Sequence, residues 1–386
     1  MTDTRRYVRV EPARERVEPA DLVSRLAGLR KLQNDWRTKY DPRKSPPTFE
    51  FLALSRGEDA PVRFYLGVDD TDLLPVIESE LQTAYPESYE ISQESVDLSA
   101  ALCGEATDVT GPPNADEEPA EGGATEDPDV SLSDRTPLAA RWQGVGERSR
   151  DWMTPLTQYS NVHPESGGDD SPSRAPLATA IERLTDATAP TVLQVLFTRY
   201  SNWQKGAESR KKQIETKHDG FLQSAKTSLV DLVYGADEER IRDRRRGRDP
   251  PRVGESAQPT SSAGSGEVAS RQALIDQKGP SKTFTVNLRA VSVLPPDPDD
   301  ALEAQATTTI ETLANAFNHL DGYFYSLEGS RVTEGLTDIR DPAQKTLERL
   351  VTRSFTQSFR GKRRSQLVLN ADELANFVAV PSAQAL

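Results

Sequence analysis

Two clusters of basic residues are the candidate contact sites in this sequence. The first consists of Arg242, Arg244, Arg245, Arg246 and Arg248. Arginine side chains can neutralise phosphates, so this run could contact DNA. The interpretation that we favour is a solvated loop, in which the arginines pair with the neighbouring acids Asp237, Glu238, Glu239, Asp243 and Asp249. The second cluster is Lys362, Arg363 and Arg364, which we expect to contact a partner subunit.

Residue patterns for catalysis or metal binding are weak. The nearest match to a P-loop ends at Lys282 and Thr283, but Asp276 and Ser281 stand where the two glycines should be, and a strand follows instead of a helix. We predict a loop-to-strand junction there. The three histidines, His163, His218 and His319, lie in different elements, and the chain has one cysteine, Cys103. We therefore expect no catalytic residues, no cofactor, no metal site and no enzymatic activity.

Composition argues against bulk attraction to nucleic acid or anionic lipid. The 386 residues include 47 Lys and Arg against 61 Asp and Glu, a formal net charge of -14. Acid on expected solvent faces, Arg in excess of Lys and abundant Ala, Val and Thr are typical of cytoplasmic proteins of extreme halophiles. The alternative is that acidic insertions dominate the total. No signal peptide or membrane helix is predicted, so we expect a cytoplasmic chain that reaches a membrane only through partners.

Residues 1–103 are predicted to form a ferredoxin-like domain, with the order β-α-β-β-α-β. Apolar alternation indicates strands at 7–10, 48–54, 62–68 and 89–98, and helical spacing indicates helices at 21–32 and 71–84. Asp70 or Thr71 is the expected N-cap of the second helix. This order is the split βαβ arrangement.

Residues 104–140 are acidic, rich in Pro and Gly and almost without bulky apolar residues, which predicts a disordered linker. A second, interrupted α+β domain is predicted over 141–359, with a flexible loop near 236–280. Its expected strands are 191–200, 282–294 and 322–327, and its expected helices are 177–184, 207–234, 299–320 and 341–359. It looks like a degenerate copy of the first domain, so the fold class is α+β with two ferredoxin-like antiparallel units and long disordered insertions.

Residues 360–386 are predicted to form a helix and then the start of a strand. Asn370 is a suitable N-cap, Asp372 and Glu373 place acid in the first turn, and Leu374, Phe377 and Val378 share one face. On sequence alone this segment reads as a lead into a further domain.

Seven segments carry a resemblance to a known family: FEFLALSR, VRFYLGVD, LLPVIESELQTAYP, YEISQESVDL, TVLQVLFTRYSNW, FTVNLRAVSV and LVLNADELANFVAVP. Their succession resembles the N-terminal, non-motor region of the conjugative DNA-transfer ATPases of the type IV secretion and HerA-like group, particularly haloarchaeal versions. The resemblance implies a membrane-associated assembly, often of mobile elements, that moves DNA or protein by ATP hydrolysis. No motor follows in this sequence, so ATPase activity is not expected.

The leading hypothesis is thus a non-catalytic accessory module that docks with an ATPase motor subunit, other type IV secretion components or another copy of itself. The alternative is a nucleic-acid-binding protein that uses ferredoxin-like sheets and the Arg-rich loop. Such sheets stack bases on exposed aromatics. Phe49, Phe51, Phe64 and Tyr65 are aromatic, but core packing explains Phe49 and Phe51 equally well. An enzyme of unknown type ranks last.

Overall fold

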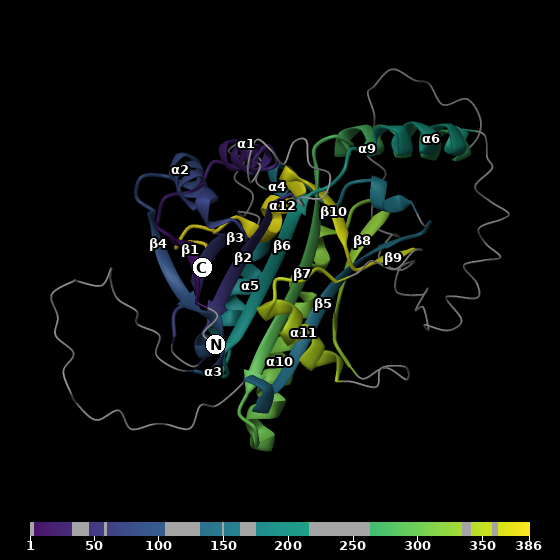
Figure 1. The fold of residues 1–386 in the computed structure, drawn as a ribbon. Coiled ribbons are helices and arrows are strands. Elements are labelled where there is room, and N and C mark those ends of the chain that lie inside the picture. Colours follow the sequence, from purple (N-terminus) through teal and green to yellow (C-terminus); the bar gives the residue numbers. More distant parts are fainter. Residues whose placement is uncertain are drawn as a thin grey trace, which may run out of the picture.

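The computed structural model describes residues 4–32, 46–57, 60–104, 132–148, 150–162, 175–215, 263–333, 341–356 and 362–386. Within them the chain is a mixed α+β protein built on one antiparallel sheet (Figure 1). None of the helices described is both long and apolar enough to cross a membrane.

The first unit confirms the predicted order of strands and helices. It consists of β1 (Thr4–Glu11), α1 (Pro19–Leu29), β2 (Thr48–Ser55), β3 (Arg63–Val68), α2 (Leu74–Ala84), β4 (Glu90–Asp97) and α3 (Leu98–Cys103). Helix α1 has a proline in its first turn, where the missing amide is tolerated, and buries Leu22, Leu26 and Leu29. Asp70 caps the 3-10 turn ahead of α2 by accepting from the amide of Asp72.

The second unit repeats that order with insertions. Its elements are β5 (Thr136–Gly146), η4 (Asp151–Met153), α4 (Tyr159–Val162), α5 (Pro176–Thr185), β6 (Thr191–Arg199), α6 (Gln204–Glu215), α9 (Ala263–Lys278), β7 (Thr283–Leu294), α10 (Asp300–Asn315), β8 (Tyr325–Arg331) and α11 (Pro342–Val351). A C-terminal segment, residues 362–386, adds β9 (Arg363–Arg364), β10 (Leu367–Asn370) and α12 (Ala371–Val378).

The strand order of the sheet is β4-β1-β3-β2-β6-β7-β5-β8, with every pairing antiparallel. In each unit the fourth strand lies beside the first, the first beside the third, and the third beside the second, as in a split βαβ fold. The units meet through their second strands, β2 and β6. At this junction Phe49 stands opposite Phe197, with ring centroids 5.2 Å apart. The two units therefore share one continuous sheet.

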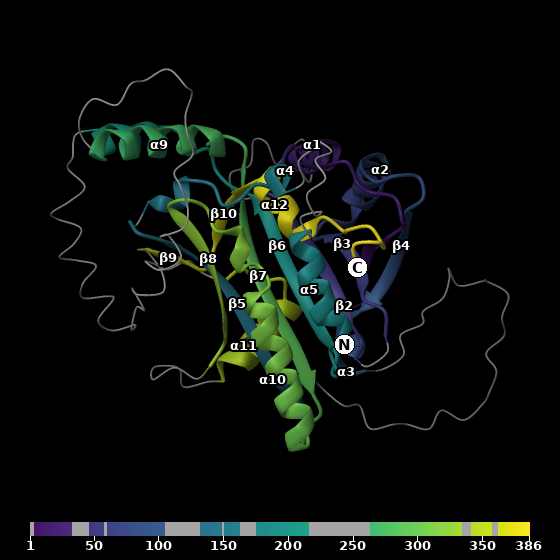
Figure 2. The same ribbon diagram turned by 180° about the vertical axis from the view of Figure 1, so that it is seen from behind.

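The sheet has two differently covered faces. Helices α1, α2, α5, α10 and α12 bury one face in a large apolar core, and Figure 2 shows α5 and α10 crossing it. A smaller core on the opposite face lies under α3 and α11, the helices that follow the fourth strand of each unit. We call this opposite face the second face. Phe49, Phe51 and Phe64 belong to the large core, whereas Tyr65 belongs to the second face.

The C-terminal segment is part of the sheet. Strands β5 and β7 pair as far as Arg141 and Arg289, beyond which they separate. Strand β9 then pairs with β5 at Gly144 and Val145, and β10 pairs with β7 over Thr283–Val286. The segment thus fills the opening between two strands of the second unit.

Three sequence predictions need correction. The boundary at residue 140 is wrong, because β5 runs from Thr136 to Gly146 across it. The predicted flexible loop near 236–280 includes α9, a helix from Ala263 to Lys278. The predicted strand after the C-terminal helix is not formed: residues 379–382 are buried without strand pairing, and the strand β10 precedes the helix instead. Residues 105–131 and 216–262 lie outside the described residues.

Candidate functional site

The five arginines of the 242–248 run lie outside the described residues. They fall between α6 and α9, which pack against each other as a helix pair that we call the stalk. The stalk projects beyond the end of the sheet (Figure 1). Lys211 of α6 pairs with Asp276 of α9, and the side-chain amide of Gln272 donates to the Glu215 carboxylate at 2.8 Å. The two helices therefore run antiparallel.

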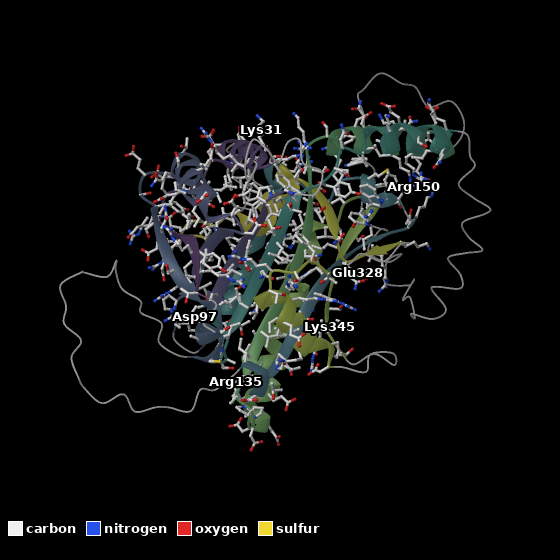
Figure 3. The ribbon with its side chains drawn as sticks, in the orientation of Figure 1. Lys31, Asp97, Arg135, Arg150, Glu328 and Lys345 are labelled. Atoms are coloured by element: carbon white, nitrogen blue, oxygen red, sulfur yellow. The ribbon has the colours of Figure 1, made fainter. Side chains whose placement is uncertain are left out.

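A buried ionic cluster fixes the base of the stalk to the second unit. Asp151 is 2% exposed and accepts from Arg271 Nη1 of α9 at 2.5 Å, while Arg210 Nη2 of α6 lies 3.9 Å from the same carboxylate. Arg271 also donates to Glu147 at 3.0 Å. Burial raises the pKa of Asp151, and Arg271 opposes that shift. Near this cluster Arg150, labelled in Figure 3, donates to the side-chain oxygen of Gln213 in α6 at 2.9 Å.

The second predicted cluster, Lys362 to Arg364, lies at β9. The Arg364 guanidinium lies over the Trp152 ring at 4.5 Å, and Arg363 pairs at 3.6 Å with Glu328 of β8, which Figure 3 labels. The carbonyl of Lys362 accepts from the amide of Gly146 at 3.1 Å. Among these three side chains Arg363 is the exposed one, and the contacts of Arg363 and Arg364 hold β9 against the second unit.

The stalk also meets the C-terminal segment, at an ion pair that the sequence did not reveal. Lys278 ends α9 and Glu373 lies in the first turn of α12; both are fully buried, and their charged atoms are 3.1 Å apart. Asn370 and Glu373 form a capping box, which confirms the predicted N-cap. Burial raises the pKa of Glu373, with Lys278 opposing the shift, and burial lowers the pKa of Lys278.

A second unforeseen network lies at the junction of the two units on the second face. Glu50 of β2 is fully buried, and its carboxylate accepts from Tyr7 Oη at 2.9 Å, from Gln194 of β6 and from Arg353 just after α11. Gln194 in turn accepts from Arg289 at 2.5 Å. One carboxylate thus ties together strands of both units and the end of α11. An acid within the apolar run FEFLALS was the available signal.

Tyr7 and Tyr65 occupy the central strands of the first unit on the second face, where a ferredoxin-like sheet would stack bases. Their ring centroids are 5.8 Å apart, but both side chains are buried. Tyr7 donates to Glu50, and Tyr65 donates to Glu94 at 3.3 Å. Buried rings beside carboxylates are a poor platform for nucleic acid.

The described residues assemble no metal-binding arrangement. No group of three or more His, Cys, Asp or Glu residues there could hold a metal ion. The P-loop-like stretch is the turn that ends α9 and begins β7, with Gly279 at φ +68°, which confirms the predicted loop-to-strand junction. Comparison of the chain with protein-family models and with curated proteins finds no match in either set.

Proposed function

We propose that this chain is a non-catalytic accessory or N-terminal module of a conjugation-type, type IV secretion DNA-translocating ATPase, and that it docks with the motor subunit. The proposal is supported by the segments that carry the family resemblance. Six of them form β2, β3, α2, β4, β6 and β7 within twin split βαβ units. The observation that carries the proposal concerns the last segment, LVLNADELANFVAVP, which is buried across both units as β10, α12 and the residues after it.

Docking would be polar in character. The large hydrophobic side chains that are exposed in the described part of the chain are Val76 and Leu386. Such a surface lacks the contiguous apolar patch of an obligate interface. Charged side chains of the stalk, including Lys205 and Glu208, and the edge strands β4 and β8 are the accessible groups. An edge strand offers unpaired backbone groups to a partner strand.

The nucleic-acid alternative depends on the Arg-rich run, because the aromatic residues of the first unit's sheet are buried. A variant with Gln at positions 242, 244, 245, 246 and 248 separates the two functions. Filter binding of single- and double-stranded DNA across salt should give a steep salt dependence that this variant loses if the run contacts phosphates. If the run is a solvated loop, both proteins should bind DNA equally weakly.

The test of the proposal is affinity capture of the tagged chain from its native lysate in high salt, with mass spectrometry of the bound proteins. We expect enrichment of an ATPase with a Walker A lysine or of another secretion component, and equal capture by the five-glutamine variant. The partner is then purified, and its ATP turnover is measured with and without this chain. Failure to enrich any such protein, or ATP hydrolysis by this chain alone, would contradict the proposal.

A further inference from the structure

The contact between the stalk and the C-terminal segment is a buried ion pair with its hydrogen bonds satisfied. Glu373 Oε1 accepts from Lys278 Nζ at 3.1 Å and from the amide of Leu156 at 2.7 Å. Glu373 Oε2 accepts from the amide of Asn370 at 2.8 Å, and Lys278 Nζ also donates to the carbonyl of Thr154 at 3.0 Å. The end of α9, the chain after η4 and the start of α12 therefore converge on two charged groups.

A buried ion pair is a poor means of gaining stability, because desolvation of both charges offsets most of their attraction. Removing or displacing one partner is costly, since the other charge then stays buried without a counterion. The pair between Lys278 and Glu373 therefore fixes a position. The C-terminal end of α9, at the stalk base, and the start of α12 are held so that one cannot shift far without the other.

The far end of α12 is attached to the first unit. The amide of Val380 donates to Tyr85 Oη at 3.0 Å, and the amide of Ala383 donates to the carbonyl of Ala13 at 2.7 Å. Helix α12 also packs against α1. Val378 and Val380 line a small apolar cavity of about 10 Å³, so the packing at this end leaves a little room. One short helix thus spans from the stalk base to the first unit.

We propose that the C-terminal segment couples the stalk to the first unit, with Lys278 and Glu373 as the contact through which displacement of the stalk loosens the junction at Tyr85 and Ala13. The segment is suited to this because it crosses both units as one covalent piece. A partner that moves the stalk would thereby loosen residues 379–383, which contact the first unit. Coupling of this kind is reciprocal, so loosening the junction must also loosen the end of the stalk.

Amide hydrogen exchange with single-residue resolution tests both directions. Lys278→Met is expected to speed exchange at the Val380 and Ala383 amides by about tenfold, while the amides of β3 stay unchanged. Glu373→Gln should do the same, because its single oxygen can still accept from the Asn370 amide of the capping box, while the charge and the acceptor for Lys278 and the Leu156 amide are lost. In the reverse direction, Tyr85→Phe removes one hydrogen bond of the first unit and is expected to speed exchange at Gly279 and Lys282, beside the stalk end, by about threefold.

The matched control is Lys211→Met, which breaks an exposed ion pair on the stalk and should leave the Val380 and Ala383 amides unchanged. Distal effects in both directions support the coupling. Effects confined to the neighbourhood of each substitution overturn it, as does an equal loss of protection over the whole sheet. Should Lys278→Met fail to fold, Tyr85→Phe alone decides, because it leaves the ion pair intact.

Discussion

The two units share one strand order but differ at the connection between their second and third strands. In the first unit, residues 56–62 join β2 to β3, whereas in the second unit residues 200–282 join β6 to β7 and include the stalk. Buried charges follow the same division. Among the described residues of the first unit Glu50 is the buried carboxylate, whereas the second unit buries Asp151, Arg210 and Arg271 where the stalk begins.

The difference shows what an insertion requires of an antiparallel scaffold. A short turn needs only its own backbone hydrogen bonds, and the first unit closes over an apolar core. The stalk helices project beyond the end of the sheet, and their positions are fixed by paired charges. Buried ion pairs add little net stability but penalise a displaced arrangement. The first unit is thus held mainly by apolar packing, whereas the stalk of the second unit is held in position by paired charges.

The largest change in stability is expected for Glu50→Ala at the junction of the units. The substitution leaves Arg353 and Tyr7 without their carboxylate in a buried site. We expect the free energy of unfolding to fall by about 3–5 kcal/mol, measured by urea denaturation with circular dichroism. Because the sheet is continuous, the transition should remain single.

Two further variants serve as comparisons for Glu50→Ala. Glu50→Gln keeps an acceptor for Tyr7 and should cost less than Glu50→Ala. Glu80→Ala breaks the partly exposed pair with Arg25 and should change stability by at most about 0.5 kcal/mol. Two separate unfolding transitions in Glu50→Ala would show that the units are independent bodies, against our interpretation.

Alkaline pH should destabilise the fold through its buried tyrosines. Burial raises the pKa of Tyr159 from 10.0 to about 12, and the pKa of Tyr89 is raised as well. Because each phenol must stay protonated in the folded state, its stabilising contribution is present below pH 10 and is lost as the pH rises towards the folded-state pKa. Each such tyrosine should lower the unfolding free energy by about 1.4 kcal/mol per pH unit above 10.

Urea denaturation between pH 9 and 11.5, with absorbance at 295 nm to follow phenolate, measures this slope. Tyr159→Phe in the second unit and Tyr89→Phe in the first should each reduce the slope of unfolding free energy against pH by the contribution of one proton, about 1.4 kcal/mol per pH unit. Tyr7, Tyr65 and Tyr85 also have raised pKa values, so within the described part of the chain four of the six affected side chains belong to the first unit and two, Tyr159 and Tyr325, to the second. Phenolate absorbance that appears well before unfolding would contradict this account.

Glycines on the strands offer a smaller test in each unit. A Cβ at Gly67 would lie 2.6 Å from the Tyr7 ring, and one at Gly144 would lie 1.6 Å from Tyr325 Oη. Alanine at either position should cost about 1–3 kcal/mol, because a buried ring must move. Gly28 of α1 has no atom within 4 Å of such a Cβ, so Gly28→Ala should instead stabilise by about 0.5–1 kcal/mol. Equal effects at all three positions in thermal unfolding would rule out the packing explanation.

Local patterns in the sequence predicted much of this fold. The strands of the first unit follow from apolar alternation, and the N-cap at Asn370 follows from residue type alone. Strand β5 was missed because Pro137, two glycines and paired alanines weaken its pattern, although Leu138, Ala140 and Trp142 are buried in the large core. Its true role depends on pairing with β7 and β8, which no local pattern specifies.

The charged sites were harder to predict, since their chemistry comes from tertiary contacts. Glu373 reads as an ordinary first-turn acid, and its partner Lys278 lies 95 residues earlier in the chain. Likewise Arg353 reaches Glu50 across 303 residues. Lys362, Arg363 and Arg364 were expected from sequence to contact a partner subunit, and in the structure Arg364 packs against Trp152. Sequence distance hides such pairs until the sheet is assembled.

The smallest test compares a helix cap from each unit. In Asp97→Ala the start of α3 loses an acceptor for the amides of Ser99 and Ala100, which should cost about 1 kcal/mol and stay local. In Asn370→Ala the capping box around Glu373 is opened beside the buried ion pair, so we expect a larger loss, about 2 kcal/mol. Urea denaturation of both variants gives the comparison. If Asp97→Ala costs as much as Asn370→Ala, the capping box adds nothing to the ion pair, and the contrast between an apolar first unit and a charge-positioned second unit fails at this site.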